Sequence, residues 1–200
     1  MQISVRFAGM GGQGIIFAGI VLARAAALYE AHEGRGLYAI QTQSYGPAAR
    51  GESSKCDVVI ADEPSFYPFV DRPDYLLLMS QPASEKFIGQ ASPRTVVLLD
   101  EDSVEDRPDL KHFTVPAIRT AEAIGHRDSA NMVMLGALVQ MSGVVSKNSV
   151  LKAIAEVSPM GSAESNEKAF LEGIRIAKGL KALDRDPVET AFAPGGRESA

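Results

Sequence analysis

The chain has 200 residues, of which 46% are hydrophobic and 22% charged, and it contains 18 glycines. These values are typical of a globular protein with a sizeable core. Its net charge of −5 argues against general binding to nucleic acid or to an anionic membrane. The single cysteine, Cys56, excludes a disulfide within the chain and an iron–sulfur cluster held by four of its own thiolates. One cysteine also fits a reduced, cytoplasmic setting.

No segment reads as a signal peptide or as a membrane span. Arg6 and several glycines interrupt the N-terminal region, and no uninterrupted apolar run approaches about 18–20 residues. The three histidines, His32, His112 and His126, are scattered along the chain. No two of them have the spacing of metal ligands, so no metal site is expected.

The N-terminal half alternates strand and helix signals. Residues 2–8 alternate polar and apolar side chains, which predicts a strand ending at a group of glycines. Residues 15–30 are apolar at helical spacing and contain no proline, which predicts a long helix that begins near Gly14. Further expected elements are strands at 36–42, 56–62, 74–80 and 94–100, a loop at 43–55, a short helix at 63–70 and a helix at 83–90.

The C-terminal part is rich in helix signals after a last strand at 110–116. Residues 129–143 are apolar nearly all round, which predicts a central, buried helix. Ser146 has the position of an N-cap for a helix over 147–157. The remaining expected elements are a helix at 117–125, a docked helix at 165–184 with an apolar stripe at positions 169, 173, 176, 180 and 183, and a loose tail at 186–200.

Strands that alternate with helices predict an α/β fold. We expect a three-layer, Rossmann-like architecture, in which a mainly parallel sheet carries helices on both faces and the C-terminal part is rich in helices. The chain shows no internal repeat and no low-complexity linker. A single domain over residues 1–185 is therefore the expected organisation.

The segment FAGMGGQGIIFAG, residues 7–19, contains Gly9, Gly11 and Gly14 in a G-x-G-x-x-G pattern between a strand and a helix. Glycines allow positive φ and a close approach of the backbone to a ligand. The N-terminus of a helix offers unpaired N–H groups and a partial positive charge to a phosphate. The alternative is a tight strand-to-helix turn that holds nothing.

A nicotinamide dinucleotide requires more than this turn. An acidic residue should end the second strand, about 20 residues further on, and bond the ribose. The predicted second strand ends in Ile40, Gln41 and Thr42, and the chain shows no separate substrate domain. We therefore expect a phosphate ligand other than NAD.

A second landmark is QSYGPAARGESSKCDVVIAD, residues 43–62. In a parallel sheet this loop leaves the same carboxyl edge as the glycine turn, so the two can face one site. Arg50 can pair with a phosphate or carboxylate, and Tyr45 can stack or donate a hydrogen bond; a solvated Arg50 and a packing role for Tyr45 are the alternatives. Cys56 opens a buried strand and is interpreted as a small core residue.

Three separated motifs carry a family resemblance. GMGGQG at 9–14 followed by AG at 18–19, QSYGPAARGESSKCDV at 43–58 and NMVMLGAL at 131–138 resemble the gamma subunit of the 2-oxoacid:ferredoxin oxidoreductases. The resemblance covers about residues 3–180, and the SYGPxxRG form is most similar to the 2-oxoglutarate-type enzymes. Glu52 departs from the pattern, since the family usually has a second glycine there.

The resemblance implies a multi-subunit enzyme that decarboxylates a 2-oxoacid oxidatively, reduces ferredoxin and transfers the acyl group to coenzyme A. It also implies that thiamine diphosphate, magnesium and the iron–sulfur clusters belong to partner chains: alpha and beta subunits and, in some complexes, a ferredoxin-like delta subunit. This chain is then inactive alone and has no catalytic residues of its own. In the family the gamma domain helps to form the coenzyme A side of the site. The residues that the resemblance assigns to coenzyme A are Gly9, Gly11, Gly12, Gln13, Gly14, Ser44, Tyr45 and Arg50.

Two alternatives remain open at this point. One is another branch of the same family, with pyruvate, a branched-chain oxoacid or indolepyruvate as substrate. The other is a free-standing Rossmann-like module that binds a nucleotide or phosphate without any catalytic complex. Met132, Met134 and Met141 are interpreted as core residues and not as an interface, and Asn131 either caps its helix or reaches the loops.

Overall fold

A computed structural model describes residues 2–44, 53–64, 67–105 and 110–183 of the chain. Its centre is a single six-stranded sheet with the strand order β2-β3-β1-β4-β5-β6. The strands are β1 (Gln2–Met10), β2 (Tyr38–Ser44), β3 (Ser53–Ala61), β4 (Tyr75–Leu78), β5 (Val96–Asp100) and β6 (His112–Val115). Residues 186–200, the predicted tail, lie outside the described residues.

The sheet is mainly parallel, as predicted, with one reversed strand. β1, β4, β5 and β6 run parallel to one another, whereas β3 is antiparallel to both of its neighbours, β1 and β2. The connection from Ser44 to Ser53 contains eight residues, 45–52. A parallel neighbour needs a crossover of a dozen residues or more, so a connection this short returns the chain antiparallel.

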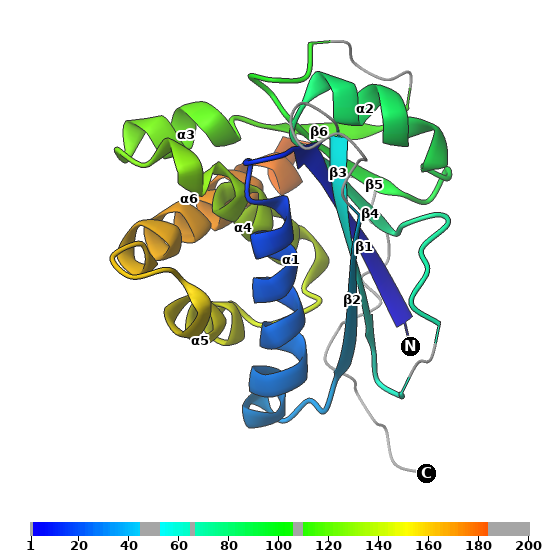
Figure 1. Cartoon of the computed structure of the whole chain (residues 1–200), viewed down its shortest axis with the longest axis vertical. Helices are drawn as coiled ribbons and strands as arrows, with labels where there is room; N and C mark the ends of the chain where they lie inside the picture. The colour runs from blue at the N-terminus through cyan, green and yellow to red at the C-terminus, as the bar shows by residue number, and fades with distance from the viewer. Residues whose placement is uncertain (1, 45–52, 65–66, 106–109, 184–200) are drawn as a thin grey trace.

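Helices cover both faces of the sheet, unequally (Figure 1). One face carries α2 (Gln81–Phe87), which ends in the short turn η3 (Ile88–Gln90). The other face carries the larger group: α1 (Ile15–Arg24), α3 (Ala117–Ala123), α4 (Ala130–Ser142), α5 (Lys147–Val157) and α6 (Ala163–Leu183). Two hydrophobic clusters lie between the sheet and these two groups of helices. The three-layer architecture with a helix-rich C-terminal part is therefore confirmed.

α4 is the central helix of the larger group, as its uniformly apolar sequence predicts. It packs closely against α6 because glycines stand at the contact: a Cβ on Gly136 would lie 2.1 Å from the Phe170 carbonyl oxygen, and one on Gly173 would lie 2.0 Å from that of Val133. Two helix backbones can approach this closely only where neither carries a side chain. The buried stripe of α6 is made by Ala169, Phe170, Gly173, Ile174 and Ala177, whereas the predicted stripe positions Ile176 and Leu180 are only partly buried.

Two local predictions differ from the structure, and a third is confirmed. The helix predicted at 63–70 is not formed in its described part, residues 63–64 and 67–70. The long helix from Gly14 is α-helical only to Arg24 and continues as the π-turn η1 (Ala25–Tyr29) and the 3-10 turn η2 (Glu30–Glu33). Ser146 caps α5 as predicted, since its Oγ accepts a hydrogen bond from the Ser149 N–H at 3.1 Å.

The prediction that no segment is apolar enough for a membrane span does not hold for the N-terminal helical stretch. Ile15–Glu33 meets the length and composition criteria for such a span, with a mean hydropathy of 1.4. A core helix of a globular protein passes the same test. Its α1 part packs on the sheet so closely that a Cβ on Gly19 would lie 2.2 Å from the Cys56 Sγ.

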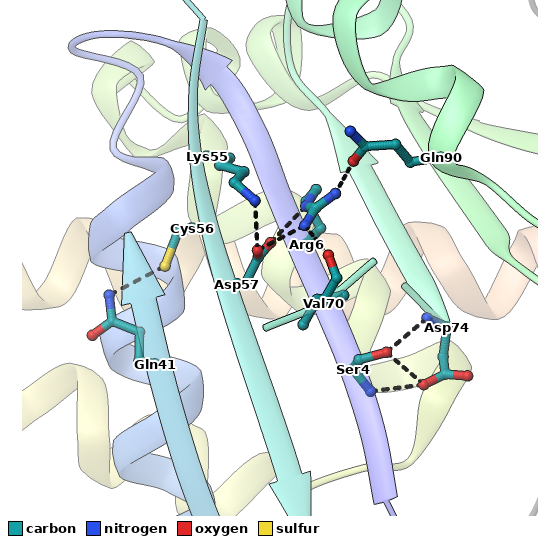
Figure 2. Close-up of polar contacts among 9 residues, drawn as sticks. All are labelled: Ser4, Arg6, Gln41, Lys55, Cys56, Asp57, Val70, Asp74 and Gln90. Atoms are coloured by element: carbon teal, nitrogen blue, oxygen red, sulfur yellow. Dashed lines mark hydrogen bonds and ion pairs between the residues drawn. The ribbon is translucent and has the colours of Figure 1, made fainter. Parts of the chain in front are cut away.

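A buried ionic cluster crosses the sheet on the α2 face (Figure 2). The Arg6 guanidinium on β1 donates two hydrogen bonds to the Asp57 carboxylate on β3, at 2.6 and 2.7 Å, and Arg6 and Asp57 are only 1% and 3% exposed. Arg6 also donates to the Val70 carbonyl at 2.5 Å and to the Gln90 side chain, and Lys55 pairs with Asp57 at 3.0 Å. The cluster thus attaches segment 67–70 and the end of α2 to the centre of the sheet.

Candidate functional site

The glycine turn, residues 9–14, leaves the end of β1 and enters α1 (Figure 1). Gly12 and Gly14 have φ of +95° and +69°, a region that costs other residues about 1–2 kcal/mol. Gly11 has no positive φ, and nothing lies within 4 Å of a Cβ added at Gly11 or Gly12. Both residues are exposed, and their main-chain N–H groups donate no hydrogen bond to any described residue. Within the described part of the chain, the tip of the turn therefore presents unbonded amides.

The Gln13 side chain holds this turn in place with two hydrogen bonds. Its side-chain oxygen accepts a hydrogen bond from the Met10 N–H at 2.7 Å, and its amide nitrogen donates to the Met79 carbonyl at 2.7 Å. The Gln13 main-chain N–H donates to the Met10 carbonyl at 3.2 Å. Because both ends of the side-chain amide are used inside the protein, the structure gives Gln13 a supporting position in the turn. A direct contact of Gln13 with a ligand stays a prediction.

Gly9 and Gly14 provide space for neighbouring side chains. A Cβ on Gly9 would lie 2.6 Å from the Gln13 Oε1, and one on Gly14 would lie 2.3 Å from the Asn131 Nδ2. Gly9 is buried inside β1, so its lack of a side chain makes room for Gln13. The positions with open space above them, Gly11 and Gly12, are the part of the motif that faces outward.

Asn131 is a site residue whose function the sequence left open. It is 2% exposed at the start of α4, and its Nδ2 donates to the Gly14 carbonyl at 2.8 Å. Its Oδ1 accepts from the Met132 N–H at 2.9 Å. The predicted alternative in which Asn131 reaches the loops is thus the one observed. The sequence feature that pointed to Asn131 was a single side-chain amide at the start of an otherwise apolar helix.

The loop of the second predicted landmark leaves β2 and enters β3 at the same edge of the sheet as the glycine turn. Ser53, the first residue of β3, is the register partner of Met10, and Ser44, the last residue of β2, is that of Lys55. Ser44 is exposed at this edge. Tyr45 and Arg50 lie outside the described residues, so their assignments remain predictions.

The electrostatics of the turn favour an anion. α1 begins at Ile15 with Gly14 as its N-cap residue, without a side-chain cap and without an acidic residue in its first turn. The first N–H groups of a helix have no partner within the helix, and the helix dipole adds a partial positive charge at this end. A diphosphate is a suitable ligand for such a site, since main-chain amides and the dipole hold its oxygens without a charged side chain.

A hollow of about 500 Å³ with both polar and apolar walls adjoins the turn. It lies among the start of α1, the α3–α4 connection and the α5–α6 connection. Gly14 belongs to both the turn and the hollow, and Asn131, which also lines the hollow, donates to the Gly14 carbonyl. A ligand bound at the turn therefore has room beside it. The other residues that line the hollow are Phe17, Gly125, His126, Arg127, Asp128, Ser129, Pro159, Ser162, Ser165 and Asn166.

Cys56 has the properties of a core residue. It is fully buried, and desolvation raises the pKa of its thiol to about 11, although a hydrogen bond from Gln41 lowers it slightly. A nucleophilic cysteine needs a thiolate near neutral pH. Among the described residues, no three His, Cys, Asp or Glu side chains gather closely enough to hold a metal ion.

Comparison with known proteins supplies the family. The family model for pyruvate ferredoxin/flavodoxin oxidoreductase matches residues 4–176. The chain is 46% identical to 2-oxoglutarate synthase subunit KorC of Methanocaldococcus jannaschii over 185 residues, which are 90% of this chain and 96% of that relative. The chain belongs to the pyruvate ferredoxin/flavodoxin oxidoreductase family. The resemblance inferred from the three sequence motifs is thereby confirmed.

Solved structures agree with this assignment. The gamma subunit of a keto/oxoacid ferredoxin oxidoreductase from Geobacter sulfurreducens has a TM-score of 0.77 and 37% identity, over 88% of this chain and 99% of that one. A 2-oxoglutarate:ferredoxin oxidoreductase from Magnetococcus marinus shares the fold at a TM-score of 0.77 and 24% identity, and this chain spans 31% of that one. The predicted function, a gamma-type subunit of a 2-oxoacid:ferredoxin oxidoreductase with 2-oxoglutarate-type relatives, is confirmed.

Proposed function

We propose that the glycine turn is the anion-holding part of the coenzyme A site in a 2-oxoglutarate:ferredoxin oxidoreductase. The exposed N–H groups of Gly11 and Gly12 donate to phosphate oxygens of the coenzyme, and the N-terminus of α1 adds its dipole. The hollow beside Gly14 takes the neighbouring part of the ligand. Ser44 assists from the end of β2, and Tyr45 and Arg50 assist from the loop that follows it.

One observation carries this proposal: the amides at the tip of the turn bond to no described residue, although the turn itself is held by side-chain hydrogen bonds. Gln13 and Asn131 fix it from two sides with hydrogen bonds of 2.7–2.8 Å. A turn that served only to connect β1 to α1 would not need these hydrogen bonds to hold the N–H groups of Gly11 and Gly12 in place. Preorganised donors bind an anion well because they lose little freedom on binding. The M. marinus enzyme is described with 2-oxoglutarate, coenzyme A and succinyl-CoA bound.

The chemistry of decarboxylation and electron transfer belongs to partner chains in this proposal. The chain has one cysteine, and that thiol is buried with a raised pKa, so it holds no four-thiolate cluster. Its relatives carry subunit names. We therefore propose alpha and beta partners that supply thiamine diphosphate, magnesium and iron–sulfur clusters, a delta subunit in some assemblies, ferredoxin as electron acceptor, and a cytoplasmic location. Residues 1–185 then act as one gamma-type domain.

Gly11→Val in the assembled complex tests the proposal. A Cβ at this position meets no described atom within 4 Å, and Gly11 has no positive φ, so we expect the fold to tolerate valine while the side chain covers the donors. We expect the KM for coenzyme A to rise at least tenfold, about the effect of losing one or two charge-assisted hydrogen bonds, while the KM for 2-oxoglutarate stays near its original value. Steady-state reduction of ferredoxin or viologen measures both constants.

Gly36→Val is the matched control. Gly36 is exposed just before β2, at the opposite edge of the sheet, and a Cβ there also meets nothing within 4 Å. It should leave both KM values unchanged. An unaltered coenzyme A KM in the Gly11→Val complex would mean that the turn is only a connection. Tight binding of NAD or an adenine nucleotide by the lone chain would favour a free-standing module instead.

A further inference from the structure

A chain of hydrogen bonds runs along the carboxyl edge of the sheet, away from the glycine turn. Gln13 donates to the Met79 carbonyl directly after β4, and the Ser103 hydroxyl reaches the same carbonyl at 2.8 Å. Ser103 also lies 2.5 Å from the Oδ2 of Asp100, the last residue of β5. The Asp100 Oδ1 in turn accepts from the main-chain N–H groups of Ala117 and Ile118 at the start of α3, at 3.0 and 3.2 Å.

Asp100 and Met79 in this series of hydrogen bonds are shielded from solvent. Asp100 is 0% and Met79 1% exposed, and Ser103 is half-buried. The Met79 N–H donates to the Ala8 carbonyl of β1 at 2.9 Å, so the Met79 peptide is held by β1 on one side and by Gln13 and Ser103 on the other. Hydrogen bonds in such surroundings are strong, and an unpaired group there is costly.

The hydrogen-bonded series Asp100–Ser103–Met79 lacks one proton when Asp100 is ionised. The Ser103 hydroxyl has one hydrogen, yet both of its close neighbours, the Met79 carbonyl and the Asp100 carboxylate, are acceptors. A proton on Asp100 completes the chain, since Asp100 then donates to Ser103 and Ser103 donates to Met79. Burial also raises the pKa of the Asp100 carboxyl. An asparagine at this position would donate in the same way through its Nδ2.

We propose that Ser103 and Asp100 are positioning residues for the glycine turn: through the Met79 carbonyl they hold Gln13, and so set the geometry of the Gly11 and Gly12 amides. This inference rests on the proposed function, because it concerns affinity for the same anion. Neither residue reaches the tip of the turn. Their effect should therefore appear in the binding of coenzyme A and not in the chemical step.

The test measures the coenzyme A KM and kcat of complexes that carry Ser103→Ala, with Ser4→Ala as matched control. Ser4 is also a partly buried serine that bonds an aspartate: its Oγ donates at 2.8 Å to Asp74, directly before β4, at the opposite edge of the sheet (Figure 2). Ser103→Ala should raise the KM about three- to tenfold, the range that loss of one hydrogen bond gives, with kcat within about twofold. Ser4→Ala should leave both constants unchanged.

Conservative variants separate positioning from general damage. Asp100→Asn and Ser103→Thr retain the donors that this series of hydrogen bonds needs. Each should therefore keep the KM for coenzyme A within about twofold of the original value. Should the Ser103→Ala complex fail to assemble, Ser103→Gly, which also lacks the hydroxyl and suits a turn, is measured in its place.

Each outcome separates the two proposals. An unchanged KM in Ser103→Ala, together with a raised KM in Gly11→Val, overturns the positioning function and leaves the coenzyme A site standing. Unchanged KM values in both variants overturn the coenzyme A site itself. Equal losses in Ser103→Ala and Ser4→Ala, or a loss confined to kcat, would show that Ser103 only stabilises the fold, and would overturn the positioning function.

Discussion

Replacing Asp57 by asparagine removes the charge that neutralises Arg6 inside the sheet (Figure 2). The Arg6 guanidinium is 1% exposed and donates two of its hydrogen bonds to this carboxylate. In the variant one of the two acceptors becomes an N–H donor that faces the guanidinium. Val70 and Gln90 remain as neutral acceptors. Breaking a buried ion pair from one side costs about 3–5 kcal/mol, a large part of the roughly 5–15 kcal/mol by which domains are stable.

Urea denaturation of the purified chain, followed by circular dichroism, measures this loss of the free energy of unfolding. Glu172→Gln is the control, because Glu172 pairs with Arg175 on the surface of α6, where the side chains are 34% and 71% exposed. That pair should contribute less than about 1 kcal/mol. The double variant Arg6→Met with Asp57→Leu removes both charges and should be more stable than Asp57→Leu alone.

Two results would refute this reasoning. One is an Asp57→Asn variant that loses less than about 1 kcal/mol, which would mean that water or other groups solvate the free guanidinium. The other is additivity, in which the double variant loses the sum of the two single losses. Additivity would show that Arg6 and Asp57 act independently, contrary to the direct contact between them.

Gly136→Ala should destabilise the chain by about 1–3 kcal/mol, because its Cβ would lie 2.1 Å from the Phe170 carbonyl oxygen and force α4 away from α6; the same denaturation assay measures it, and an unchanged midpoint contradicts it. Cys56 should resist alkylation by iodoacetamide at neutral pH, since burial raises the pKa of its thiol to about 11. Labelling at pH 7 in the folded chain as fast as in urea would contradict this.

The central strands were predictable from the sequence because burial on both faces leaves an apolar run. The segments 74–80 and 94–100 therefore predicted β4 and β5 within one or two residues. The reversed direction of β3 was not predicted, because it depends on the length of the connection and not on the residues of the strand. Arg6 occupies a polar position of an alternating strand, which does not reveal its burial, and its partner Asp57 lies 51 residues further along the chain.

The candidate site was likewise predictable from the sequence only in part. The glycine pattern located the turn, and its strand–helix context predicted the free N–H groups of α1. The supports of the turn were not predictable to the same extent. The Met79 contact uses a main-chain carbonyl, which leaves no trace in the residue type, and Ser103 resembles any polar loop residue until the fold brings it to the same edge of the sheet.

A structure of the assembled complex with coenzyme A bound tests the central claim most directly. The account predicts a phosphate oxygen of the coenzyme within about 2.7–3.2 Å of the main-chain nitrogen of Gly11 or Gly12, with Gln13 still bonded to Met79. A coenzyme bound elsewhere, with the turn covered by a partner subunit and its amides bonded to protein, would contradict it.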